Sequence, residues 1–171
     1  MSINRATARD AEVLTELSVS TFRDSFAAQN EQENMDMYIA EAMSLEKLAA
    51  ELNDTKNIFF IAWDGNTAAG YSKIRPGYES QELSNNNPLE IERIYVAEQY
   101  QGQKVGAALM AHCLDYAVQN NYDIVWLGVW EHNHKAIDFY TKWGFHIFSS
   151  HIFRLGHDDQ TDILMKKHLV P

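Results

Sequence analysis

The chain has 171 residues, enough for one domain that buries roughly 70% of the surface its unfolded form exposes. Its 24 acidic and 14 basic residues give a formal net charge of -10, which disfavours nucleic-acid phosphates and favours a cationic small substrate. The first ten residues are polar, the longest unbroken apolar run is residues 58–63, and the single Cys113 excludes an internal disulfide. We therefore expect a cytoplasmic protein without a membrane span.

Apolar periodicity in the first half predicts a strand, then helices, then a hairpin. The elements are expected as a strand at 3–7, a helix from the cap Asp10 to Phe26, helices at 35–43 and 44–53, and strands at 57–63 and 67–74. The turn Asp64-Gly65-Asn66 is a strong hairpin signal. Six carboxylates between residues 31 and 51 make these helices acidic, and they either face water or attract a polycation.

The second half predicts a strand-helix-strand-helix unit followed by a closing hairpin. Its elements are a mobile surface loop at 75–88, a strand at 89–96, a helix from Val105 past Tyr116, a strand at 123–130, a helix at 134–143, and strands at 145–155 and 161–167. Asn133 caps the helix at 134–143 and Gly144 ends it. The order predicts one α/β (α+β) domain over residues 1–171, with a mixed, mostly antiparallel central sheet and helices on both faces.

The most informative stretch runs from Leu89 to Met110, where a strand leads through a polar turn into a helix. The turn consists of Gln101, Gly102, Gln103, Lys104, Val105, Gly106 and Ala107. The first amides of such a helix have no intrahelical acceptor, and the helix dipole adds partial positive charge there. The turn therefore predicts a site for a pyrophosphate.

Two motifs in this order resemble the GNAT superfamily of N-acetyltransferases. The turn resembles the superfamily's Q/R-x-x-G-x-G/A phosphate loop through Gln101 and Gly106, although Lys104 stands where a glycine is frequent. The second motif, N-x-x-A-x-x-F-Y, matches Asn133, Ala136, Phe139 and Tyr140, and it is followed by Gly144-Phe145. The resemblance implies a single GNAT-like domain that transfers an acetyl group from acetyl-CoA.

The chain further resembles the PaiA-type spermidine/spermine N-acetyltransferases. The similar stretches are TFRDSFAAQN, LEIERIYV, IVWLGVWEHNHKAIDFY and DDQTDILM. This resemblance implies a polyamine as the small-molecule amine substrate. The acetylated nitrogen, the preferred amine and the choice between monomer and homodimer stay open.

The superfamily resemblance also implies where the cofactor binds. The pantetheine arm of acetyl-CoA would pair like an extra strand beside Ile94, Tyr95 and Val96, and the pyrophosphate would meet the amides of residues 101–107. Asn133 would hydrogen-bond the arm. Lys142 either meets a CoA phosphate or is a solvated lysine at a helix C-terminus.

The same resemblance suggests the catalytic groups. An alkylammonium must lose a proton before it attacks the thioester, so a carboxylate is needed near the acceptor. Strand alternation predicts that Glu90 and Glu92 face the same side as Ile94 and Val96, and Glu92 is the preferred base because it resembles the base of polyamine acetyltransferases. A backbone N–H near Val96 would hold the oxyanion, and Tyr140 would protonate the departing CoA thiolate.

Two other functions remain open at the level of sequence. The first is acetylation of a protein or peptide, which needs an open groove where the 75–88 loop could instead close a small pocket. The second is a non-catalytic acetyl-CoA-binding regulator, although intact Glu92 and Tyr140 favour catalysis. No metal is expected, because His132 and His134 have no partner set at ligand spacing.

Overall fold

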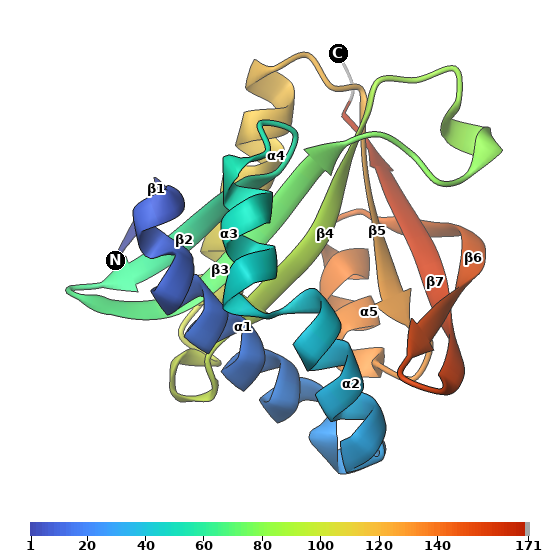
Figure 1. Cartoon of the computed structure of the whole chain (residues 1–171). Helices are drawn as coiled ribbons and strands as arrows, with labels where there is room; N and C mark the ends of the chain where they lie inside the picture. Colours follow the sequence, from blue (N-terminus) through green and yellow to red (C-terminus); the bar gives the residue numbers. More distant parts are fainter. Residues whose placement is uncertain (170–171) are drawn as a thin grey trace.

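A seven-stranded sheet forms the centre of the computed structural model, which describes residues 1–169 (Figure 1). The strands lie in the order β1-β2-β3-β4-β5-β7-β6, and β4 and β5 are parallel whereas the other neighbours are antiparallel. Their bounds are Ser2–Arg5 (β1), Ile58–Asp64 (β2), Thr67–Pro76 (β3), Pro88–Val96 (β4), Ile124–Trp130 (β5), His146–Leu155 (β6) and Asp158–His168 (β7). The predicted mixed, mostly antiparallel sheet is confirmed.

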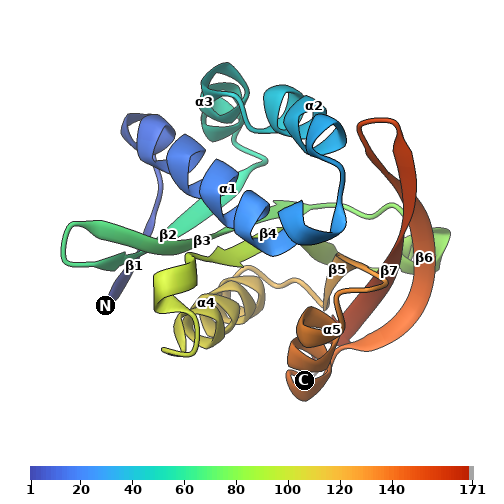
Figure 2. The ribbon, with the colours of Figure 1, turned by 90° about the horizontal axis from the view of Figure 1, so that it is seen from below.

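Helices cover both faces of this sheet, as predicted (Figure 2). One face carries α1 (Ala11–Phe26), α2 (Gln32–Ala42) and α3 (Leu45–Asn53), and the opposite face carries α4 (Val105–Gln119) and α5 (His134–Lys142). Each layer buries its own apolar cluster against the strands. Within residues 1–169, no helix is long and apolar enough to cross a membrane.

Strand β5 is apolar at nearly every position because both of its faces are covered. Val125 and Leu127 pack into the core shared with α4 and α5, whereas Ile124 and Trp126 pack on the other face beside Leu83. Alternation therefore sends successive apolar side chains into two different cores. This buried strand lies next to the gap described below.

Glycines set the ends of two elements. Gly144 adopts a φ of +85°, and Phe145 N–H donates to the Tyr140 carbonyl, so α5 ends where the sequence predicts. Gly156, with a φ of +61°, allows a two-residue turn between Leu155 and Asp158. Strand β7 consequently begins at Asp158, three residues before the predicted start at 161.

The connection between β3 and β4 differs from the mobile surface loop that the sequence predicts. Residues 77–87 include a short 3-10 turn, and Leu83 within it is fully buried. Trp126 of β5 donates its indole N–H to the Gly77 carbonyl at 2.8 Å, and Lys166 of β7 lies 3.9 Å from Glu82. The connection is therefore anchored to the sheet at one end of the cleft described next.

Candidate active site

Strands β4 and β5 separate in the middle of the sheet. They pair only from Pro88 to Glu90, opposite Ile124 to Trp126, although β4 continues to Val96 and β5 to Trp130. Ala97 donates its N–H to Ala69 of β3 at 3.0 Å, so alternation along the strand turns the Val96 N–H away from β3 and toward the gap. The gap therefore offers unpaired backbone groups to an extended molecule.

A bulge in β4 lies at the edge of this gap. Lys73 of β3 is opposite Arg93, but the next residue, Ile74, is opposite Ile91, so Glu92 has no partner residue on β3. An extra residue of this kind bends the strand and changes the direction of the side chains around it. The bulge therefore helps to explain why β4 departs from β5.

The bulge also overturns the predicted orientation of the two carboxylates. Ile91 and Ile94 both pack in the core beneath α4 and α5, which strict alternation would forbid. Glu90 and Glu92 instead share a guanidinium on the opposite face, the one covered by α1 to α3. The prediction that both carboxylates face the side of Ile94 and Val96 is therefore wrong.

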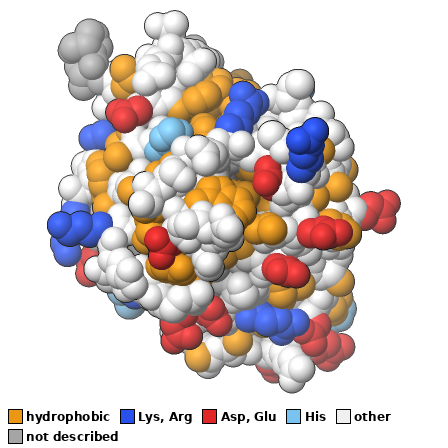
Figure 3. Space-filling view, turned by 90° about the vertical axis from the view of Figure 1, so that its left-hand side faces the viewer, with side chains coloured by type: hydrophobic (Ala, Val, Ile, Leu, Met, Phe, Trp, Pro, Cys, Tyr) orange, Lys and Arg blue, Asp and Glu red, His pale blue; other side chains and the backbone are white. Residues whose placement is uncertain are grey.

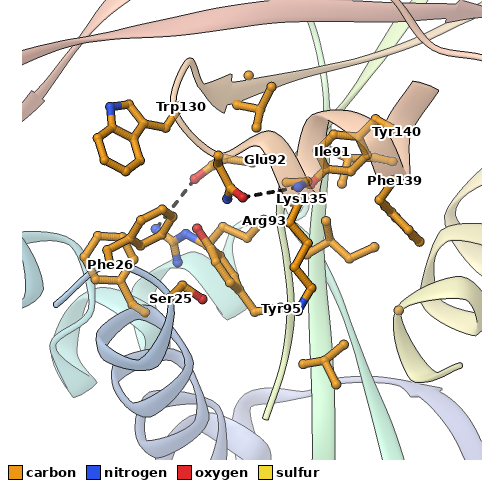
Figure 4. Close-up of a pocket in the computed structure, with 18 of the residues that line it drawn as sticks. Ser25, Phe26, Ile91, Glu92, Arg93, Tyr95, Trp130, Lys135, Phe139 and Tyr140 are labelled. Carbon is orange, nitrogen blue, oxygen red and sulfur yellow. Dashed lines mark hydrogen bonds and ion pairs between the residues drawn. The ribbon is translucent and has the colours of Figure 1, made fainter. Parts of the chain in front are cut away.

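A cleft of about 830 Å³ follows the gap from the turn before α4 to strands β6 and β7. One end is lined by Gln101, Gly102 and residues 104–107, and it is called the cofactor end after the expectation from the sequence. The other end is lined by side chains of α1, β4, β6 and β7, and it is called the acceptor end on the same basis. Figure 4 shows Tyr140, Phe139 and Lys135 on one side of this pocket and Phe26 on the other. The two ends are thus chemically distinct parts of one continuous space.

The cofactor end presents free backbone amides. The first hydrogen bond of α4 runs from Ala108 N–H to the Lys104 carbonyl at 3.0 Å, and the amides of residues 104–107 have no acceptor within residues 1–169. Gln101 and Gln103 differ, because their N–H groups donate to Glu98 and Tyr100. Gln103 also lies outside the cleft lining, so the predicted anion site narrows to Gly102 and residues 104–107.

Two lysines flank these amides. Lys104 adopts a left-handed conformation with a φ of +65°, the backbone geometry that a glycine at this position would adopt without strain. Lys135, in the first turn of α5, donates an N–H of its ammonium group to Gln101 Oε1 at 3.1 Å. Both lysines line the cleft, which adds positive charge where an anion would bind.

Tyr140 and Asn133 hold α5 against the gap. Tyr140 is buried among the α4 and α5 core residues, yet its ring lines the cleft and its hydroxyl has no hydrogen-bond partner among the described residues. Burial raises the pKa of Tyr140, so the phenol stays protonated and can act as an acid. Asn133 accepts a hydrogen bond from Ala136 N–H at 3.2 Å through Oδ1, which leaves its amide NH₂ to face the cleft.

Glu90 and Glu92 have opposite pKa shifts at the acceptor end. Burial raises the pKa of Glu90, although Arg75 lies 2.6 Å from its Oε2 and opposes the shift. Burial acts on Glu92 as well, but Lys73, Arg93 and Arg75 together outweigh it and lower the pKa of this carboxyl. Neighbouring carboxyls with diverging pKa values are suited to different roles, one as a proton acceptor and one as a fixed negative charge.

A buried network of ion pairs holds the Glu92 carboxylate in place. The Lys73 ammonium, 3% exposed, lies 2.8 Å from Glu92 Oε1 and 3.1 Å from Glu51 Oε2 of α3. Arg93 lies 3.5 Å from the same Glu51 oxygen and donates to the carbonyl of Ala42, the last residue of α2. Glu92 is therefore held rigidly as an anion, which argues against it as the mobile proton acceptor.

The acceptor end is acidic. On the side of the molecule where β1 lies, acidic side chains are likewise most numerous in the lower half of the view (Figure 3). Five carboxylates line the cleft, from Asp24, Glu79, Glu90, Glu92 and Asp162. None of the six carboxylates between residues 31 and 51 lines it. The carboxylates that could attract a cation into the cleft are therefore not the acidic residues of the 31–51 segment to which the sequence pointed.

A histidine joins two of these carboxylates. His151 Nδ1 lies 2.6 Å from Glu79 Oε2, and its Nε2 lies 3.5 Å from Asp162 Oδ2. The hydrogen bond with Asp162 and the Glu79 charge raise the pKa of His151 despite its partial burial. The ring links the 77–87 connection to strands β6 and β7 at the acceptor end.

Aromatic side chains form the walls around these charges. Phe26 of α1 packs edge-on against Tyr95 of β4 and Trp130 of β5, and Tyr38 of α2 packs against Phe153 of β6. The ring centroids lie 5.2 to 6.3 Å apart. Such walls suit an alkyl chain that carries positive charges.

Two hydrogen bonds join the α1–α2 connection to the β6–β7 hairpin beside the acceptor end. Gln160 of β7 donates its side-chain amide to Asn30 Oδ1 at 2.6 Å, and His157 N–H donates to Asn34 Oδ1 at 2.8 Å. A side chain at Gly156 would meet Asn34 Oδ1 at 2.5 Å, so the hairpin and α2 approach closely. The α1–α2 connection and the β6–β7 hairpin therefore meet beside the cleft.

Several residues fall outside the predicted site or were missed by it. Lys142 is exposed at the end of α5 and is not among the residues that line the cleft, whereas Lys135 is. Sequence reasoning also missed Arg75 and His151, which reach the cleft from β3 and β6. The N-x-x-A motif could have pointed to Lys135, since a residue in the first turn after Asn133 lies near the loop.

Neither a metal centre nor a nucleophilic cysteine is apparent. Within residues 1–169, no three metal-ligating side chains gather to hold an ion. Cys113 is buried with its thiol 3.3 Å from the Ser72 hydroxyl, and burial raises the pKa of this thiol to about 11. Cys113 is therefore a core residue.

Parted central strands beside a helix N-terminus with free amides fit an extended acyl carrier with an anionic end, such as acyl-CoA. The sequence profile of the acetyltransferase (GNAT) family matches residues 14–145, and the chain belongs to this family. An uncharacterized N-acetyltransferase of Lactobacillus delbrueckii subsp. lactis, from the pepI 3′ region, is 34% identical over 170 residues, which cover 99% of this chain and 98% of the relative. The protein is thus an N-acetyltransferase with acetyl-CoA as co-substrate.

Solved structures share the fold. PaiA N-acetyltransferase from Thermoplasma acidophilum, in complex with coenzyme A, has a TM-score of 0.78 and 22% identity, with 98% of this chain and 99% of that chain covered. Ribosomal-protein-alanine N-acetyltransferase from Brucella melitensis has a TM-score of 0.68 and 18% identity, with 99% and 100% covered. The fold is therefore shared with one enzyme named for a protein acceptor and with another whose name gives no acceptor, so the acceptor must be argued from the cleft.

Proposed function

We propose that this acetyltransferase acts on a small cationic amine, with polyamines such as spermidine and spermine as the leading class. The observation that carries this proposal is the acceptor end of the cleft, where five carboxylates lie beside aromatic walls. The charges attract ammonium groups and the rings suit the alkyl chain between them. The resemblance to PaiA-type sequences supports the same class.

Acetyl-CoA would lie along the gap between β4 and β5. Its pantetheine arm would pair with the free backbone edge at Ile94 and Val96, and Asn133 would donate to the arm. The pyrophosphate would meet the amides of Gly102 and residues 104–107, with Lys104 and Lys135 adding charge. Lys135, rather than Lys142, is the α5 lysine that we assign to this end.

Transfer would proceed by direct attack of the amine on the thioester carbon. Glu90 would accept the ammonium proton, because the raised pKa of its carboxyl makes it a better base than Glu92. The Val96 N–H would stabilise the oxyanion as it forms. Tyr140 would donate its proton to the departing CoA thiolate as the C–S bond breaks, and the second proton lost by the acceptor nitrogen would restore the phenol. The reaction would end with the N-acetylated amine, CoA and one proton held by Glu90.

A protein or peptide acceptor fits this cleft less well. The hydrogen bonds of Asn30 with Gln160 and of Asn34 with His157 join the α1–α2 connection to the β6–β7 hairpin, and we infer that this junction restricts the room for an extended peptide. A non-catalytic regulator would need neither a proton acceptor nor a protonated phenol at the gap. Glu90 and Tyr140 therefore favour an enzyme with a small acceptor.

Release of free CoA, measured with a thiol reagent, tests this proposal across a panel of acceptors. The panel contains spermidine, spermine, shorter diamines, matched monoamines, amino acids and peptides with free N-termini. We expect the highest kcat/KM with polyamines and a large loss with amino acids, whose carboxylate would meet the acidic wall. Faster turnover with peptides than with any polyamine would contradict the proposal, as would acetyl-CoA binding without transfer to any amine.

A further inference from the structure

Arg75 occupies the space between the two carboxylates at the acceptor end. Its Nε lies 2.6 Å from Glu90 Oε2 and 3.0 Å from Glu92 Oε2. The Arg75 side chain is 40% exposed, whereas the neighbouring cations Lys73 and Arg93 are 3% and 7% exposed. Arg75 is thus the cation of this cluster with freedom to move.

The hydrogen bonding of Arg75 is incomplete at this position. Its single Nε proton is donated to Glu90, and Glu92 Oε2 is buried without a hydrogen-bond partner despite the nearby charge. An alkylammonium carries three N–H donors around one nitrogen, so it can donate to both carboxylates at once. The position suits an ammonium group better than the guanidinium that fills it.

A third carboxylate, that of Glu79, offers the Arg75 guanidinium a second anionic partner. Arg75 Nη2 is 3.7 Å from Glu79 Oε1, and the other oxygen of Glu79 is held by His151 at 2.6 Å. Glu79 belongs to the connection that Leu83 and Trp126 anchor to the sheet. A guanidinium that leaves Glu90 and Glu92 therefore has a fixed carboxylate within reach.

We infer that Arg75 is a specificity-determining residue that competes with the acceptor for the position between Glu90 and Glu92. The ammonium of the incoming amine displaces the guanidinium, which moves toward Glu79. A neutral or zwitterionic amine gains less from this exchange, because it brings no net positive charge to two carboxylates. The inference rests on the proposed function, since it requires a cationic acceptor.

The two partners of the outer ion pair have opposite expected effects. Arg75→Gln removes the competitor, so the KM for spermidine falls by about threefold or more, the size of effect that one half-exposed ion pair produces. Glu79→Gln removes the outer position and holds Arg75 inside, so the KM rises by a similar factor. Glu82→Gln, at another exposed carboxylate of the same connection, leaves the KM unchanged.

Opposite signs exclude a merely structural ion pair, because loss of either partner of a structural pair would change the KM in the same direction. Simple attraction by charge also gives opposite signs, but it predicts that Glu79→Gln still raises the KM when combined with Arg75→Gln, whereas competition predicts that this rise disappears once the arginine is gone. Titration of spermidine into the CoA-bound protein by calorimetry gives the same comparison without turnover, and tighter binding to Arg75→Gln is expected. A KM that rises in both variants, or one that changes in neither, overturns the inference while acetylation of polyamines stands. Absence of both spermidine binding and acetylation in the unaltered protein overturns the proposed function as well.

Discussion

Tyr140→Phe tests the proposed acid at the gap with a minimal change. The substitution removes one hydroxyl that has no hydrogen-bond partner in residues 1–169, and it keeps the ring that packs 5.5 Å from Phe139 and 6.1 Å from Phe145. We therefore expect little change in stability and an unchanged affinity for CoA. A well-placed general acid contributes about 10² to 10⁴ in rate, or about 2.7 to 5.5 kcal/mol of barrier, so kcat should fall by that factor.

The assay combines thiol release at saturating acetyl-CoA with calorimetric titration of CoA. Tyr116→Phe is the matched control, because this tyrosine of α4 packs against Phe60 and does not line the cleft. Burial raises the pKa of Tyr140, so no loss of its proton is expected across the neutral range. Turnover of Tyr140→Phe equal to that of Tyr116→Phe would refute the acid role, and a parallel loss of CoA affinity would assign Tyr140 to binding instead.

Three further changes follow from the same geometry. Glu90→Gln should lower kcat by about 10² or more. In the unaltered protein kcat/KM should fall as the pH drops through the pKa of Glu90, because the protonated carboxyl cannot act as a base. Burial raises this pKa above the ordinary value for glutamate. Lys73→Met removes the buried ammonium that lies closest to both Glu51 and Glu92, so it should destabilise the fold by about 3 to 5 kcal/mol in urea unfolding, with partial recovery in Lys73→Met/Glu51→Gln. Lys104→Gly should remove the backbone strain of a non-glycine residue in the left-handed conformation, and so stabilise the fold by up to about 1 kcal/mol. The same change should weaken CoA binding, because the positive charge of the lysine is lost.

Each of these predictions has a contradicting result. If kcat/KM of Glu90→Gln still falls at low pH as it does in the unaltered protein, Glu90 is not the base. A Lys73→Met protein as stable as the original would mean that the buried charges find other partners. Lower stability in Lys104→Gly would show that the lysine side chain stabilises its own turn.

The sequence was sufficient to predict the order of elements and the turn that leads into α4. Gly144, Asn133 and the turn at Gly65 carry local signals whose conformational meaning does not depend on distant contacts. The apolar run of β5 likewise predicts a strand covered on both faces. These features are local, which explains why they could be predicted without the structure.

The acceptor end could not be predicted because it is made by long-range contacts. The bulge at Glu92 breaks the period of two on which the orientation of Glu90 was predicted, and nothing in the sequence marks the extra residue. Lys73, in the middle of a strand, has no feature that distinguishes a buried lysine from a solvated one. Glu79 and His151 are 72 positions apart, and only the folded sheet brings them together.

Calorimetric titration of the folded protein with CoA tests the central claim most directly, because the gap between β4 and β5 and the amides of residues 104–107 must together hold this molecule. The account predicts saturable binding of one CoA per chain, weakened in Lys135→Ala and in Lys104→Gly. Absence of any saturable binding of CoA or acetyl-CoA to the folded chain would contradict it.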